Sequence, residues 1–150
     1  MLGELSKEEI EGVLNSNVIG RIGCVGDDRV YVVPITYVYD NGYVIGHTTE
    51  GMKIEFLRQN PECCFEVDEM KSISNWQSVI AWGTYEELEG DAADQAMEKL
   101  VSRLLPLMPS ETSHAGRMGP ISSRRTSTLN ANSPIVYRIQ LREKSGRYER

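Results

Sequence analysis

The segment from His47 to Lys53 gathers side chains that suit the binding of an anion. It reads His-Thr-Thr-Glu-Gly-Met-Lys, and it leaves an expected strand, turns and enters an expected helix. The first backbone N–H groups of a helix have no acceptor within it, so two hydroxyls and an ammonium here could join them around one phosphate. Alternatively, Thr48 or Thr49 only caps the helix and Lys53 is a solvated lysine. A lysine in a first turn opposes the helix dipole, which favours an anion but leaves both interpretations open.

Two strand segments point to a ligand more weakly. Pro34 lies inside an apolar run and has no N–H for a sheet ladder, which predicts an edge, a bulge or a ligand-facing position. Residues 76–79 read Trp-Gln-Ser-Val, and such polar groups beside a large aromatic could end a strand in solvent or meet the edge of a ring. A flat ring could lie against Pro34, whereas residues 76–79 taken alone indicate a structural role.

Histidines, loop basic residues and cysteines give no clear catalytic or metal signature. His47 is a candidate catalytic residue, but a lone histidine at a strand end is more often a hydrogen-bonded structural residue. Adjacent Cys63 and Cys64 would point to opposite faces of a strand and lack metal-ligand spacing, so we expect core packing and no metal site. The residues of a later loop that could close over a bound anion, or simply be solvated, are His114, Arg117, Arg124 and Arg125.

Strands are the elements that must position these residues. Alternating and β-branched segments predict six strands, at 18–25, 30–39, 43–47, 62–67, 77–88 and 133–142. A first helix follows a capping box at Ser6 and Glu9, a second runs from Gly51 to before Pro61, and a third covers 92–105. Six antiparallel strands with two or three peripheral helices predict a mostly β fold, a closed or nearly closed barrel, because closure removes exposed edges.

The chain is expected to form one domain over residues 1–150. Within it, 106–133 is a long irregular loop rich in Ser, Thr, Pro, Gly and Arg, and 143–150 is a charged tail. Apolar residues on both sides of the segment 31–39 favour a dimer with strands at its interface.

Composition narrows the location and the partners. The 150 residues are 40% hydrophobic and 25% charged, as in an average globular domain. A formal net charge of -6 argues against a nucleic-acid partner, which would require clustered Lys and Arg. Three cysteines, two of them adjacent, fit a reduced cytoplasm better than a disulfide framework, and no apolar run is long enough to predict a membrane span. We therefore expect a cytoplasmic protein that binds neither nucleic acid nor a membrane.

A set of short motifs occurs in an order that is more specific than any one of them. The motifs are Gly20-Arg21, Val33-Pro34-Ile35, Asp40-Asn41-Gly42, His47 through Lys53, Asn60-Pro61, Cys64-Phe65-Glu66-Val67, Trp76-Gln77-Ser78-Val79 and Gly83. With this set, over about residues 14–88 and 135–147, the chain resembles the pyridoxamine 5'-phosphate oxidase-like flavoproteins. It is most similar to their small nitroimidazole-resistance branch. The resemblance implies a six-stranded split β-barrel homodimer that holds FMN at the subunit interface.

The resemblance also implies roles for individual residues. The residues that would lie along the isoalloxazine ring are Val33, Pro34, Ile35 and Thr36. Beside the ribityl chain and phosphate would lie His47 and Thr48, and at the phosphate Thr49, Gly51, Met52 and Lys53. A neighbouring strand would contribute Trp76, Ser78 and Val79. The oxidases have a serine and an arginine where this chain has Gly51 and Met52, so half of their phosphate clamp is missing. Loss of such a charge-assisted contact typically costs about 1.5–3 kcal/mol, which predicts weaker FMN binding.

The predicted function is that of an FMN-binding oxidoreductase, in which the flavin passes a hydride or electrons to a small molecule, a nitroaromatic being one option. Pyridoxamine phosphate is not the expected substrate, because the C-terminus offers only Ser145-Gly146-Arg147-Tyr148 in place of the oxidases' basic and aromatic set. Two alternatives stay open. One is a module that binds or stores a flavin or haem without turnover, and the other is a dimeric interaction protein without a cofactor.

Overall fold

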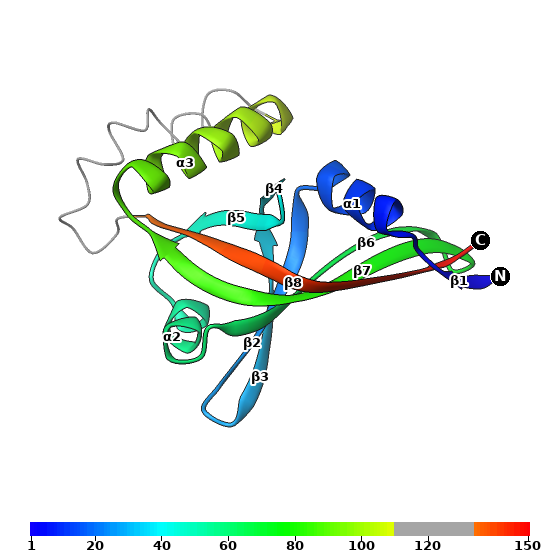
Figure 1. The fold of residues 1–150 in the computed structure, drawn as a ribbon, viewed down its shortest axis with the longest axis horizontal. Coiled ribbons are helices and arrows are strands. Elements are labelled where there is room, and N and C mark those ends of the chain that lie inside the picture. Colours follow the sequence, from blue (N-terminus) through cyan, green and yellow to red (C-terminus); the bar gives the residue numbers. More distant parts are fainter. Residues whose placement is uncertain (110–133) are drawn as a thin grey trace.

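The computed structural model describes residues 1–109 and 134–150, which form an antiparallel sheet with helices around it (Figure 1). The strands are β1 (Leu2–Glu4), β2 (Ile19–Gly26), β3 (Arg29–Thr36), β4 (Val38–Asp40), β5 (Tyr43–Thr48), β6 (Glu62–Ser72), β7 (Asn75–Leu88) and β8 (Ile135–Glu149). The helices are α1 (Lys7–Ser16), α2 (Met52–Gln59) and α3 (Gly90–Leu104), and a 3-10 turn, η1 (Leu105–Leu107), follows α3. The predicted mostly β fold with peripheral helices is confirmed.

The sheet curls without closing its hydrogen-bond ladder. Its strand order is β3-β2-β6-β7-β8-β5-β4, with β1 added to β8, so β3 and β4 are the two end strands. These end strands are consecutive in the chain and are joined through Tyr37, which is fully buried and donates its hydroxyl to the Leu14 carbonyl at 2.8 Å. Pro34 lies on β3, which among the described strands pairs with β2 alone, so the predicted edge position is confirmed. The sequence prediction of six strands is corrected to eight in the described residues, and the ladder is open.

The predicted charged tail at 143–150 is wrong, because β8 continues to Glu149. Its backbone pairs with β7 as far as Trp76 and with β1, while several of its charged side chains, such as Arg142, Glu143 and Arg147, are exposed. Gly146 lies beneath Leu5 and Ile10, where an added Cβ would come within 2.7 Å of the leucine side chain.

Other strand limits also differ from the sequence prediction. The predicted strand 30–39 is broken at the buried Tyr37, β6 continues five residues beyond 67 to Ser72, and β7 begins at Asn75. The capping box of Ser6 and Glu9 is confirmed, with hydrogen bonds of 2.9 and 3.1 Å. Most of the expected irregular loop 106–133 lies outside the described residues.

Two apolar clusters hold the fold together. The larger fills the inside of the curled sheet and includes buried residues of α1 and α2, such as Leu14 and Leu57. The smaller lies between α3 and the strands β5 and β8, and it is centred on Leu100, Ile45 and Val136. Figure 1 shows α3 and α2 on different sides of the strands. No helix among the described residues is long and apolar enough to cross a membrane.

One side of β3, β2, β6 and β7, here called the open face, carries exposed apolar side chains. Val32, Gly23, Cys64 and Trp82 form a row across these four strands, since each is paired with the next. Val32 is 61% exposed and Trp82 38%, and Val30 on the same side of β3 reaches 74%. A folded monomer rarely exposes a large contiguous apolar patch, so the open face is a candidate contact surface.

Candidate functional site

The segment His47–Lys53 joins β5 to α2, as the sequence predicted. His47 and Thr48 are the last residues of β5 and pair with Val136 and Ile135 of β8. Met52 is the first residue of α2, and Gly51 is its N-cap. The turn between them is exposed, so it presents the start of a helix to solvent.

Neither Thr48 nor Thr49 caps α2. The N-cap is Gly51, and no side chain of the described residues makes a capping hydrogen bond there. The backbone of Gly51 is extended, with φ 177°, and no described atom lies within 4 Å of a Cβ added there. The simple capping alternative is therefore wrong for this turn, and the first-turn N–H groups of α2 keep the polarity that attracts an anion.

Lys53 and Thr48 come together at the start of α2. The Lys53 ammonium donates to the Thr48 hydroxyl at 2.9 Å, and that hydroxyl donates to the Thr49 carbonyl at 3.3 Å. Lys53 is half-buried, and its burial lowers the pKa of the ammonium, with a smaller opposing effect of the Cys24 thiol. An anion bound beside the ammonium would favour its charged form.

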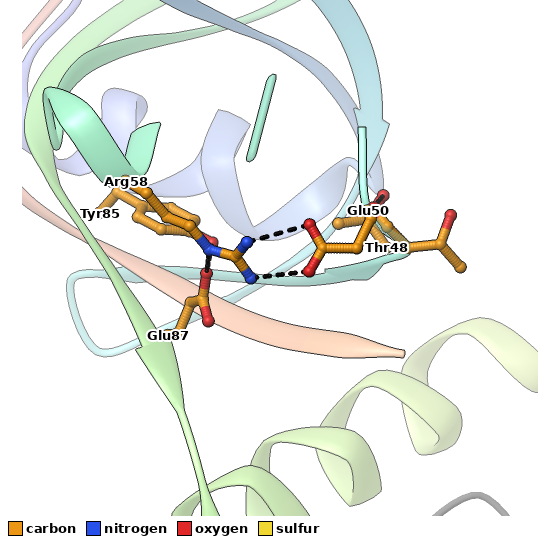
Figure 2. A network of polar contacts seen from close by, with 6 residues as sticks. Thr48, Glu50, Arg58, Tyr85 and Glu87 are labelled. Carbon is orange, nitrogen blue, oxygen red and sulfur yellow. Dashed lines mark hydrogen bonds and ion pairs between the residues drawn. The ribbon is translucent and has the colours of Figure 1, made fainter. Parts of the chain in front are cut away.

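A charge-assisted network links this turn to the sheet (Figure 2). Arg58 of α2 donates from both terminal nitrogens to the carboxylate of Glu50, at 3.0 Å each, and from Nε to Glu87 of β7 at 2.6 Å. Glu87 also accepts a hydrogen bond from the Tyr85 hydroxyl at 3.0 Å. Sequence analysis missed Glu50 and Arg58, because no short-range pattern marks contacts eight and 29 residues apart.

The candidate ring-lining residues of β3 divide between its two sides. Ile35 is 7% exposed and Val33 is half-buried, both packing with the main core, whereas Pro34 and Thr36 are exposed. Neighbouring side chains of a strand point to opposite faces, so these four side chains cannot all line one ring. Of the four, Pro34 and Thr36 lie on the open face. The outer edge of β3 pairs with no other strand of residues 1–109 and 134–150.

The candidates on β7 lie far from the turn within one chain. Ser78 pairs with Asp68, whereas Leu88 lies in the same row as Val136 and His47. Those ten residues of β7 span about 33 Å along the strand. Trp76 and Ser78 are half-buried on the side of the open face, but Val79 is 0% exposed. The expectation that the Val79 side chain reaches a ring is corrected, because it packs in the core.

His47 and Thr48 likewise point to opposite sides of β5. Ile45, on the same side as His47, packs against α3, and Val44, on the side of Thr48, packs in the main core. The two residues therefore do not line one ribityl chain together, and Lys53 shares a side with Thr48 rather than with His47. The loop residues His114, Arg117, Arg124 and Arg125 lie outside the described residues. Within residues 1–109 and 134–150, no three His, Cys, Asp or Glu side chains are grouped to hold a metal ion.

Comparison with known proteins yields one family and several similar structures. The sequence profile of the family described as pyridoxamine 5'-phosphate oxidase matches residues 6–148. The chain is similar to a FAD-binding protein from Mesorhizobium loti, with 27% identity, a TM-score of 0.74, and coverage of 100% of this chain and 99% of the other. It also has the fold of a candidate 5-nitroimidazole antibiotic resistance protein from Bacteroides thetaiotaomicron, with 18% identity, a TM-score of 0.72, and coverage of 99% and 87%.

A sequence relative comes from Rhizobium meliloti (strain 1021) and is named only as an uncharacterized protein. It is 36% identical over 84 residues, which are 56% of this chain and 56% of the relative. The match thus spans little more than half of that relative's length.

Proposed function

This chain belongs to the pyridoxamine 5'-phosphate oxidase family, and we propose that it binds FMN between two copies of itself and acts as an oxidoreductase on a small molecule. The observation that carries the proposal is the junction of β5 and α2. There, a lysine ammonium and a threonine hydroxyl 2.9 Å apart lie beside a helix start that has no side-chain cap.

The chemistry of this junction fits a flavin phosphate. Lys53 supplies a charge, Thr48 a hydroxyl, and the first turn of α2 supplies N–H groups with the positive end of the helix dipole. FMN and FAD both contain phosphate, and the similar protein from Mesorhizobium loti is described as FAD-binding. Of the two, the short turn with a single lysine favours FMN, because the neighbouring arginine, Arg58, is already paired with Glu50 and Glu87 and does not supply a charge for a further phosphate.

A second copy of the chain would complete the site. The phosphate turn and the polar residues of β7, among them Ser78, lie at opposite ends of the strand rows within one chain. The open face carries Pro34 and Ser78 together with the exposed apolar side chains of Val32 and Trp82. Packing the open faces of two copies would bury this apolar surface and bring β7 of one copy toward the turn of the other.

The protein would bind and orient the cofactor, while a bound flavin would itself supply hydride or electron transfer. Lys53 and Thr48 would hold the phosphate, and the unpaired edge of β3 with Pro34 would lie along the ring. A partner copy on the open face would exclude water from the ring. A small substrate, with a nitroaromatic as the first compound to test, would enter beside the ring.

The test is an absorbance spectrum of the purified protein after addition of FMN and removal of the excess, together with its mass by light scattering. We expect flavin bands in a protein of twice the chain mass. Addition of a reduced nicotinamide cofactor and then a nitroaromatic acceptor should bleach and restore these bands. A colourless protein would refute the cofactor, and a flavin that never cycles would leave the protein as a flavin-binding module without turnover.

A further inference from the structure

In the part of the chain that the structure describes, few side-chain contacts hold the turn that would bind the phosphate. Thr49, Glu50 and Gly51 are exposed, and open space surrounds Gly51. Among the described residues, the Thr49 carbonyl accepts a hydrogen bond from the Thr48 hydroxyl, which in turn accepts one from Lys53, and the Glu50 carboxylate accepts two hydrogen bonds from one guanidinium. That guanidinium is therefore the side chain that ties Glu50 of the turn to the rest of the molecule.

That guanidinium belongs to Arg58, and it connects the turn to rigid parts of the molecule. Arg58 sits in the last turn of α2, which is anchored to the core by buried Ile54 and Leu57. Its Nε donates to Glu87 of β7, at 2.6 Å, on the opposite side from Glu50. Figure 2 shows the guanidinium between the two carboxylates, with Thr48 next to Glu50. The contacts therefore run from Glu87 in the sheet, through Arg58 of α2, to Glu50 in the turn.

We propose that Arg58 is a positioning residue for the flavin phosphate, which through its fork to Glu50 holds the turn in the conformation that binds the phosphate. This inference rests on the proposed function, and it adds a residue that lies outside the His47–Lys53 segment. A bidentate pair fixes orientation as well as distance, and only a planar guanidinium can make it while also donating to a third group.

Arg58 does not act as the missing arginine of the phosphate clamp. It is paired with Glu50 and Glu87, so the three side chains together carry a net negative charge. A phosphate placed directly on this group would be repelled by the carboxylates. The hydrogen bonds that Arg58 donates to Glu87 and Glu50 raise the pKa of the guanidinium, so it stays charged. Its effect on the phosphate is therefore geometric.

The link should affect binding more than folding. The side chains of Arg58 and Glu50 are 43% and 53% exposed, and exposed ion pairs contribute little to stability. A displaced turn, in contrast, would separate the Thr48 hydroxyl and the α2 N–H groups from the phosphate. The loss should be confined to flavins that carry a phosphate, so riboflavin serves as the matched ligand.

The experiment measures dissociation constants for FMN and riboflavin, and the melting temperature without flavin, for Arg58→Ala, Arg58→Lys and Glu87→Ala. We expect Arg58→Ala to weaken FMN about tenfold, as for loss of a strong hydrogen-bonded contact, with riboflavin unchanged. Arg58→Lys should fail to restore FMN binding, because an ammonium cannot form the fork. Arg142→Ala, which removes another exposed pair, with Glu62, is the control and should bind FMN normally.

Glu87→Ala separates geometry from charge. Removing a carboxylate near the site would strengthen phosphate binding if only charge mattered, whereas cutting the tie to β7 should weaken it. The proposal is overturned if Arg58→Ala binds FMN like the unaltered protein, if FMN and riboflavin weaken equally, if Arg58→Lys restores full affinity, or if Glu87→Ala binds FMN more tightly. Failure of the proposed function itself is recognised separately, because Lys53→Met would then leave FMN affinity unchanged too.

Discussion

Replacing Lys53 by methionine removes the charge at the proposed phosphate site while keeping most of the side-chain volume. The ammonium lies 2.9 Å from the Thr48 hydroxyl and is half-buried, so a phosphate reached by both would be partly shielded from water. A charge-assisted hydrogen bond of this kind contributes about 1.5–3 kcal/mol, so the dissociation constant for FMN should rise about 10- to 150-fold. Riboflavin has no phosphate, and its affinity should not change.

The same substitution should not destabilise the flavin-free protein. Burial lowers the pKa of Lys53, so its charged form is less favourable in the folded than in the unfolded chain. This cost to stability is present at a pH below the pKa that Lys53 has in the folded protein. It is lost as the pH rises from there toward the ordinary pKa of a lysine. Removing the charge thus removes the cost, and the melting temperature at pH 7 should stay level or rise. A loss of FMN binding could then not be attributed to unfolding.

The assay is a titration of flavin fluorescence at low and at moderate salt. Lys99→Met is the matched control, because this exposed lysine pairs with Asp40 away from the turn. The control should leave the FMN affinity unchanged, and the salt dependence of binding should fall in Lys53→Met only. An FMN affinity within twofold of the unaltered protein in Lys53→Met would refute the phosphate site.

Three further substitutions test charge and packing. Met52→Arg restores the arginine of the oxidases at the exposed first residue of α2, and fluorescence titration should show FMN bound about 10-fold more tightly. Burial, together with the neighbouring Asp68, raises the pKa of Glu66 to about 7. The folded protein therefore favours the neutral carboxyl, and its stability falls as the pH rises from the ordinary carboxyl pKa of 4.5 through 7. Glu66→Gln should therefore flatten the change in urea-unfolding free energy between pH 5 and pH 8, and an unchanged slope would contradict this. Gly12→Ala, in α1 with nothing within 4 Å of the new Cβ, should raise that free energy by about 0.5–1 kcal/mol, and destabilisation would show hidden crowding.

The place of the turn was predictable because it depends on local features. The change of apolar period predicted a strand ending at His47 and a helix starting at Gly51, each one residue before the observed Thr48 and Met52, and Pro61 limits the helix. The cap was not predictable in the same way, since the choice between Thr49 and Gly51 depends on the backbone angles of the turn. The opposite directions of His47 and Thr48 did follow from strand alternation alone, and a stricter use of that rule would have separated them.

The strand at the C-terminus and the link through Arg58 required the tertiary structure. Residues 143–150 are polar enough to look like a tail, but β7 and β1 on either side supply backbone partners that no local pattern reveals. Arg58 contacts Glu87 across 29 residues of sequence, and only the packing of α2 beside the sheet brings them together. Long-range pairing is the part of this fold that composition and periodicity do not encode.

A flavin held between two copies would couple cofactor binding to assembly. Each site would take its phosphate contacts from the turn of one copy and further contacts from β7 of the other, so a single copy would bind only weakly. A ligand that binds the dimer and not the monomer shifts the equilibrium toward the dimer. The open face also carries Arg21 beside Glu66 and Asp68, at 3.8 and 3.5 Å, so assembly must bury charge along with apolar surface. Because burying charge is costly, the open face alone would support only a weak dimer, and the bound flavin would supply the remaining stability.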